Sequence, residues 1–111
     1  MQNEARRFFR LDYPESYRPE LQINDRCFQV QQISEEGIVA IIPNVSLNQI
    51  GAIFNATITF YDGVTFELLG RILRIEGDRV VGQLTKGINF KRMNEEQRQL
   101  RVRFPRYKFN R

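Results

Sequence analysis

The chain has 111 residues, of which 41% are hydrophobic and nine are Phe. This composition supports one packed domain over residues 1–111 and argues against a largely disordered chain. The net charge of +4 favours anionic partners without identifying them. His is absent and Cys27 is the single cysteine, so we expect no metal site, no imidazole catalysis and no internal disulfide. Because the sequence lacks both a long apolar run and a signal-peptide pattern, we expect no membrane span and a cytoplasmic location.

A basic run opens the chain. Arg6, Arg7 and Arg10 surround Phe8 and Phe9. Guanidinium groups stay charged at any working pH, and they bind phosphates or guanine edges through two parallel hydrogen bonds. The ordinary alternative is a solvated basic tail that binds nothing in particular. We expect residues 1–12 to form a flexible basic N-terminal arm.

Residues 20–92 carry the pattern of a small β-barrel. Residues 11–20 contain two prolines and are expected to form an irregular connector. Beyond them, period-two alternation and β-branched or aromatic runs predict strands. These strands are expected over residues 21–23, 28–30, 38–42, 53–61, 64–75 and 79–85. Six strands joined by short turns, without helices between them, indicate a closed or nearly closed antiparallel barrel.

Local features refine this barrel. Asp62-Gly63 predicts a primed hairpin turn, in which both central residues have positive φ. Gly70, inside a long predicted strand, indicates a bulge or bend. Cys27 is interpreted as a small buried hydrophobic residue at the start of its strand.

A short helix is expected over residues 94–104. Asn94 suits the N-cap, Gln97 the capping-box position, and Pro105 ends the helix. The residues expected on one face are Met93, Gln97, Leu100 and Phe104. Glu95 and Glu96 suit the positive end of the helix dipole. Residues 105–111 form a basic tail.

A second polar stretch lies where one predicted strand ends and the next begins. It contains Gln32, Ser34 and Gly37. Ser34 offers a short hydroxyl for a phosphate or a base edge, and Gly37 lets a ligand approach the backbone without a Cβ in the way. Both are also ordinary turn residues, so on their own they carry little functional meaning.

Together these stretches resemble the PilZ domain family. The matching motifs are R-x-x-x-R (Arg6 and Arg10), x-x-S-x-x-G (residues 32–37), and Gly-Arg-Ile-Leu-Arg at residues 70–74, which is similar to the family's G-R-V-x-x strand. Gln32 stands where the family usually has Asp or Asn. The resemblance implies a six-stranded antiparallel barrel with a C-terminal helix that binds the bacterial second messenger cyclic di-GMP. The ligand-binding residues it implies are Arg6, Arg7, Arg10, Gln32, Ser34, Gly37 and Arg74.

From these observations we predict a non-enzymatic receptor without a cofactor. Cyclic di-GMP is expected to order the N-terminal arm, so that an effector protein of a motility, pilus or exopolysaccharide system reads the change. Gln32 favours one alternative, a PilZ-type adaptor that binds no nucleotide. A small basic barrel with exposed aromatic residues is also compatible with single-stranded nucleic-acid binding. An enzyme is the least supported class, because no nucleophile and base pair stands out.

Overall fold

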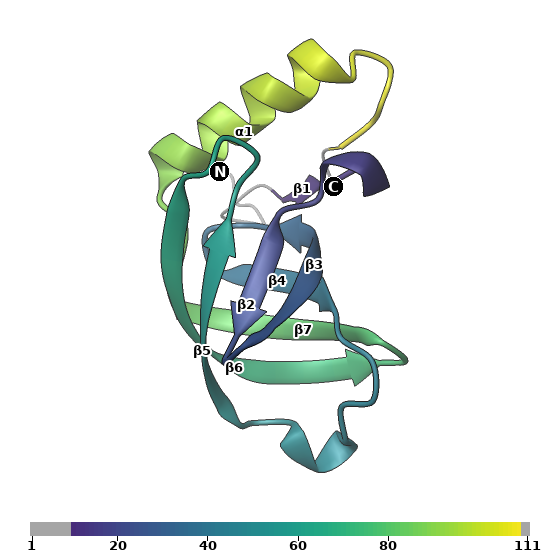
Figure 1. The fold of residues 1–111 in the computed structure, drawn as a ribbon, viewed down its shortest axis with the longest axis vertical. Coiled ribbons are helices and arrows are strands. Elements are labelled where there is room, and N and C mark those ends of the chain that lie inside the picture. The colour runs from purple at the N-terminus through teal and green to yellow at the C-terminus, as the bar shows by residue number, and fades with distance from the viewer. Residues whose placement is uncertain (1–9, 110–111) are drawn as a thin grey trace, which may run out of the picture.

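A ring of six antiparallel strands forms the centre of the computed structural model, which describes residues 10–109 (Figure 1). The hydrogen-bonded order is β1-β3-β2-β5-β6-β7-β4, and a further pairing of β3 with β4 closes β2 to β7 into a barrel. The predicted barrel is thereby confirmed. The elements are β1 Leu11–Asp12, the 3-10 turn η1 Glu15–Tyr17, β2 Glu20–Ile23, β3 Arg26–Ile33, β4 Gly37–Ile41, the 3-10 turn η2 Leu47–Gln49, β5 Ile53–Thr59, β6 Thr65–Glu76, β7 Arg79–Lys86 and α1 Phe90–Arg103.

The segment expected to be an irregular connector contains an unpredicted strand. In β1, Leu11 pairs with Ile33 and Asp12 with Gln32, at the end of β3 that β2 does not reach. Two residues are too few for a period-two pattern to appear in the sequence. β1 follows directly on Arg10, so most of the predicted basic arm, residues 1–9, lies outside the described residues.

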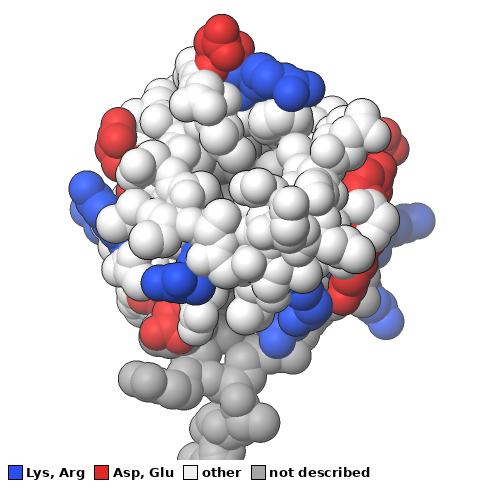
Figure 2. All heavy atoms as spheres, turned by 90° about the horizontal axis from the view of Figure 1, so that it is seen from below, with Lys and Arg blue, Asp and Glu red and all other residues white. Residues whose placement is uncertain are grey.

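The barrel core follows strand alternation, and α1 closes one end of it (Figure 1). On β4, Ile38 and Ala40 point into the core cluster, while Val39 between them does not join it. Met93 and Leu100 of α1 are fully buried against the same cluster. The opposite end, which carries η2, shows a largely uncharged surface with charged side chains towards its edge (Figure 2). No helix within residues 10–109 is long and apolar enough to cross a membrane.

Helix α1 begins earlier than expected. Asn89, not Asn94, is the N-cap, and its side chain accepts a hydrogen bond from the backbone N–H of Arg92 at 2.8 Å. The buried face also differs from the expected one, since Gln97 is only half-buried whereas Glu96 is 1% exposed. The expected interaction of Glu96 with the helix dipole is replaced by direct hydrogen bonds to buried partners, described below.

Two local predictions are corrected and one is confirmed. Gly63 has φ +87°, but Asp62 does not have positive φ, so the turn is not of the primed type. Cys27 is exposed, because the β2–β3 hairpin end extends beyond the core and exposes its neighbours as well. At Gly70 the β6–β7 register shifts, as expected of a bulge. A Cβ at Gly70 would lie 2.4 Å from the carbonyl oxygen of Gln83.

Candidate functional site

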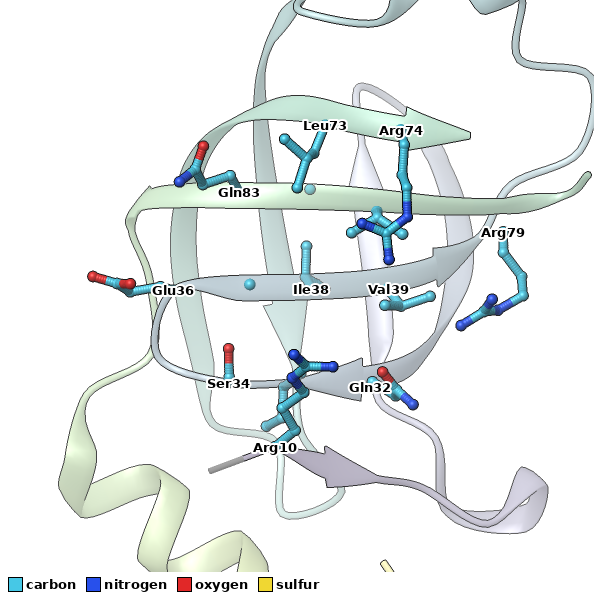
Figure 3. Close-up of a pocket in the computed structure, with 14 residues that line it drawn as sticks. Arg10, Gln32, Ser34, Glu36, Ile38, Val39, Leu73, Arg74, Arg79 and Gln83 are labelled. Atoms are coloured by element: carbon cyan, nitrogen blue, oxygen red, sulfur yellow. The ribbon is translucent and has the colours of Figure 1, made fainter. Parts of the chain in front are cut away.

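A groove of about 490 Å³ lies on the outer face of the barrel, across β3, β4, β7 and β6 (Figure 3). Five members of the predicted site set line it, although they come from separate parts of the chain. They are Arg10, Gln32, Ser34, Gly37 and Arg74. The other two, Arg6 and Arg7, lie outside the described residues.

The floor of the groove is one row of paired residues that crosses four strands. Gln32 pairs with Val39, Val39 with Val81, and Val81 with Arg74. Paired residues share a face of the sheet, and Val39 and Val81 are each 8% exposed. With strands ~4.8 Å apart, the row runs for about 14 Å. It therefore offers an apolar floor between an amide at one end and a guanidinium group at the other, suited to a flat, polar-edged ligand.

The turn between β3 and β4 forms one wall. The Ser34 N–H donates to the Gly37 carbonyl at 2.9 Å, and the Leu84 N–H donates to the Glu36 carbonyl at 2.9 Å, which fixes the turn against β7. A Cβ at Gly37 would lie 3.3 Å from the Ser34 hydroxyl oxygen, closer than side chains ordinarily approach. Glycine at position 37 therefore leaves room for the Ser34 hydroxyl beside the groove.

Arg10 stands on the same side, immediately before β1. The pairing of β1 with β3 fixes the position of Arg10 beside the end of β3. Its guanidinium group lies between Ser34 and Gln32 and points towards β4 (Figure 3). Within residues 10–109 no acidic side chain forms an ion pair with Arg10, which leaves this cation available to an anionic ligand.

At the far end of the groove, the predicted residue Arg74 belongs to a charged cluster whose other members, Glu76, Arg79 and Gln31, were not predicted from the sequence. Arg74 Nε donates to Glu76 Oε2 at 2.7 Å, and Arg79 Nη1 donates to Glu76 Oε1 at 2.8 Å. Arg79 Nε also donates to Gln31 Oε1 at 2.9 Å. The hydrogen bond from Arg74 is the main cause that holds the pKa of Glu76 below its usual value. The available signal was the short gap between the predicted strands 64–75 and 79–85, because such a hairpin sets Glu76 opposite Arg79.

Two β-bulges shape this end. The β3–β4 register shifts between Val30 and Gln32, and the β6–β7 register shifts between Ile72 and Arg74. The extra residues are Gln31, which reaches Arg79, and Leu73, which lines the groove and is 48% exposed. Bulges redirect side chains in this way, so the groove departs from strict alternation where its cations gather.

A buried polar network connects β1 with helix α1. The Tyr13 hydroxyl donates to Glu96 Oε1 at 2.5 Å, and Arg92 Nη2 donates to Glu96 Oε2 at 2.6 Å. Arg92 also binds Asp62 through two hydrogen bonds of 2.8 and 3.0 Å. Burial raises the pKa of Glu96 above its usual value, although both donors act to lower it. The network fixes the segment after Arg10 to the helix.

Comparisons with known proteins agree with this geometry. The closed six-stranded antiparallel barrel with one extra strand and a C-terminal helix is the PilZ-like fold. The sequence matches the PilZ domain family over residues 4–106, nearly its whole length. The chain therefore belongs to the PilZ domain family, whose members include cyclic di-GMP receptors and adaptor domains.

A solved structure shares this fold. The crystal structure of an uncharacterized protein from Legionella superposes with a TM-score of 0.61 at 17% sequence identity, covering 84% of this chain and 94% of that one. At this identity the likeness concerns the fold alone. None of the curated proteins matches the sequence significantly.

Proposed function

We propose that this protein is a receptor for cyclic di-GMP, which it binds in the groove between Arg10 and Arg74. One observation carries the proposal: Arg10 of the first motif and Gln32, Ser34 and Gly37 of the second line the same groove. Cyclic di-GMP presents two phosphates and two guanines. The groove offers the Arg10 guanidinium group, which forms no ion pair within residues 10–109, for phosphate, and a flat apolar floor with polar ends for a base.

Each proposed contact follows from the chemistry of its side chain. Arg10, with Arg6 and Arg7 of the arm, binds phosphate oxygens or the N7 and O6 edge of guanine. Gln32 keeps an amide that donates and accepts, although it lacks the charge of the usual aspartate. Ser34 contributes a hydroxyl at the turn. Arg74 stacks its guanidinium plane on a guanine above Val81.

The proposed signal passes through β1. A ligand that holds the arm also holds Arg10, and Arg10 is continuous with a strand that is tied to two distant elements. Tyr13 binds Glu96 of α1, and the Asp12 N–H donates to the Phe109 carbonyl of the C-terminal tail at 2.7 Å. Ordering of the arm therefore favours one arrangement of α1 and the tail, which an effector protein reads.

Calorimetric titration tests the proposal. Cyclic di-GMP is titrated into the wild type, an Arg10→Ala variant, and an Arg101→Ala control that removes the same charge from the exposed face of α1. We expect saturable binding by the wild type and the control, and a roughly tenfold to hundredfold loss for Arg10→Ala, as lost charged hydrogen bonds produce. GTP and a short single-stranded DNA are titrated separately as control ligands, each at two salt concentrations.

The adaptor is the second candidate, because Gln32 replaces the family's usual acidic or asparagine residue. Absence of cyclic di-GMP binding by the wild type contradicts the receptor proposal and favours the adaptor. Binding of the DNA with an affinity that falls steeply with salt would instead identify a nucleic-acid-binding barrel.

A further inference from the structure

We propose that Arg79, which belongs to neither motif, contacts the guanine edge of the ligand, and that Glu76 positions Arg79 and Arg74 for this task. The inference rests on the proposed function, because it concerns the same groove. Arg79 lines that groove together with Arg74, and the two side chains come from adjacent strands, β7 and β6. Figure 3 shows both guanidinium groups beside Val39, at the end remote from Ser34.

The hydrogen bonds leave donors free at this end. Arg79 uses Nε for Gln31 and Nη1 for Glu76, and within residues 10–109 its Nη2 has no hydrogen-bond partner. Arg74 uses only Nε for Glu76, so both of its terminal nitrogens are unpaired in the same part of the chain. Arg74 is thus held through Nε and Arg79 through Nε and Nη1, while Nη2 of Arg79 and both terminal nitrogens of Arg74 remain available to a ligand.

A simple structural role explains only part of this cluster. Glu76 and Arg79 stand three residues apart across a tight turn, and such an exposed pair adds little to stability. That pairing does not account for Gln31, which the β3 bulge brings within 2.9 Å of Arg79. Nor does it account for Arg74, which shares the same carboxylate. Two contacts, to Gln31 of β3 and to Glu76 of β6, fix the orientation of Arg79 towards the groove, and Arg74 of β6 holds the same carboxylate.

The floor geometry assigns the group that Arg79 contacts. Arg79 is the next outward-facing residue of β7 after Val81, so a guanine that we place over Val39 and Val81, beneath the plane of Arg74, can direct its O6 and N7 edge towards Arg79. Guanine presents two acceptors on that edge, O6 and N7, whereas adenine replaces O6 with an amino donor. Arg79 therefore favours guanine over adenine.

Titrations of cyclic di-GMP and cyclic di-AMP into the full chain test this inference. The variants are Arg79→Met, which keeps side-chain length without donors, and Glu76→Gln. The controls are Arg98→Met and Glu95→Gln, because Arg98 and Glu95 form a similar pair, three residues apart and 2.8 Å in length, on α1. We expect Arg79→Met to bind cyclic di-GMP about tenfold or more weakly, to change cyclic di-AMP binding little, and to unfold at the same temperature as Arg98→Met.

Glu76→Gln separates positioning from simple attraction. The variant makes the groove more positive, so attraction alone would strengthen binding of the anionic ligand. Glutamine keeps only one acceptor oxygen, so at least one of the two guanidinium groups loses its hydrogen bond to residue 76, and positioning predicts weaker binding. Tighter binding by Glu76→Gln would show that this carboxylate competes with the ligand.

The remaining outcomes distinguish this inference from the proposed function. If Arg10→Ala abolishes binding while Arg79→Met binds like the wild type, the role of Arg79 is refuted and the receptor stands. If Arg79→Met weakens both dinucleotides equally, the assignment to the guanine edge is wrong. If the wild type binds no cyclic di-GMP, both proposals fall together.

Discussion

Glu95 and Glu96 are neighbours on α1, yet the structure gives them opposite surroundings. Glu96 is 1% exposed and accepts hydrogen bonds from the Tyr13 hydroxyl and from Arg92. Glu95 pairs with Arg98 on the surface. The substitution Glu96→Ala removes one acceptor from two donors at once, whereas Glu95→Ala removes a contact that water replaces. The two variants should therefore differ greatly in stability.

The size of the Glu96→Ala effect follows from what the substitution leaves behind. A buried hydroxyl without a partner costs about 1–3 kcal/mol, and this cost applies to Tyr13. Arg92 keeps both hydrogen bonds to Asp62, so the cost of about 3–5 kcal/mol for a fully orphaned buried charge is not reached. The alanine variant no longer carries the free-energy cost of burying a carboxyl group, which offsets part of this loss. We expect the free energy of unfolding to fall by about 2–3 kcal/mol.

Urea unfolding followed by far-ultraviolet circular dichroism measures this effect. Glu96→Ala should shift the midpoint to clearly lower urea without changing the slope, and Glu95→Ala should unfold close to the wild type. A Tyr13→Phe variant removes one donor and should lie between them. Equal midpoints for the two glutamate variants would refute the argument, because they would show that the buried network contributes nothing to folding.

Two further predictions concern the helix start and the barrel. Asn89→Ala should lower the free energy of unfolding by about 1 kcal/mol through loss of the N-cap, while Asn94→Ala, inside the helix, should lower it little or not at all; the reverse order would contradict the observed cap. Gly70→Ala places a Cβ 2.4 Å from the Gln83 carbonyl oxygen and 3.0 Å from Phe54 Cζ, so a loss of about 1–3 kcal/mol is expected. An unchanged melting temperature for Gly70→Ala would show that the bulge relaxes freely.

The barrel could be predicted from the sequence because its strands show period-two alternation of apolar and polar residues. Apolar side chains recur at every second position where one face meets the core, and the turns between strands are short. The helix start could not be fixed in this way, since Asn89 and Asn94 are equally good caps in isolation. The choice between them depends on where β7 ends and on which face of the helix then packs against the core. The β1 strand, with two residues, left no pattern at all.

The motif residues of the candidate site could be predicted at both ends of the groove, but Arg79 and Glu76 beside Arg74 could not. Ser34 and Gly37 belong to a local turn motif, and Arg10 precedes it in a recognisable order. Arg79 faces the groove by ordinary alternation on β7, but its partner Gln31 is the extra residue of a bulge in β3, and a second bulge at Leu73 sets the register of Arg74 on β6. A bulge depends on pairing with a neighbouring strand, which a single sequence does not state. The strand pattern therefore indicated a barrel and the resemblance implied an anionic ligand, but neither indicated Arg79 or its partner Glu76.

If cyclic di-GMP binds the groove between Arg10 and Arg74, its position on the barrel can be mapped residue by residue. Backbone amide NMR shifts of isotope-labelled protein are recorded during titration with the dinucleotide. We expect the largest changes at Gln32, Ser34, Gly37 and Val81, which border one groove across β3, β4 and β7, with little change at the η2 turn. Saturable binding whose largest changes fall on η2 or on the exposed face of α1 would contradict this expectation, as would a spectrum that the ligand leaves unchanged.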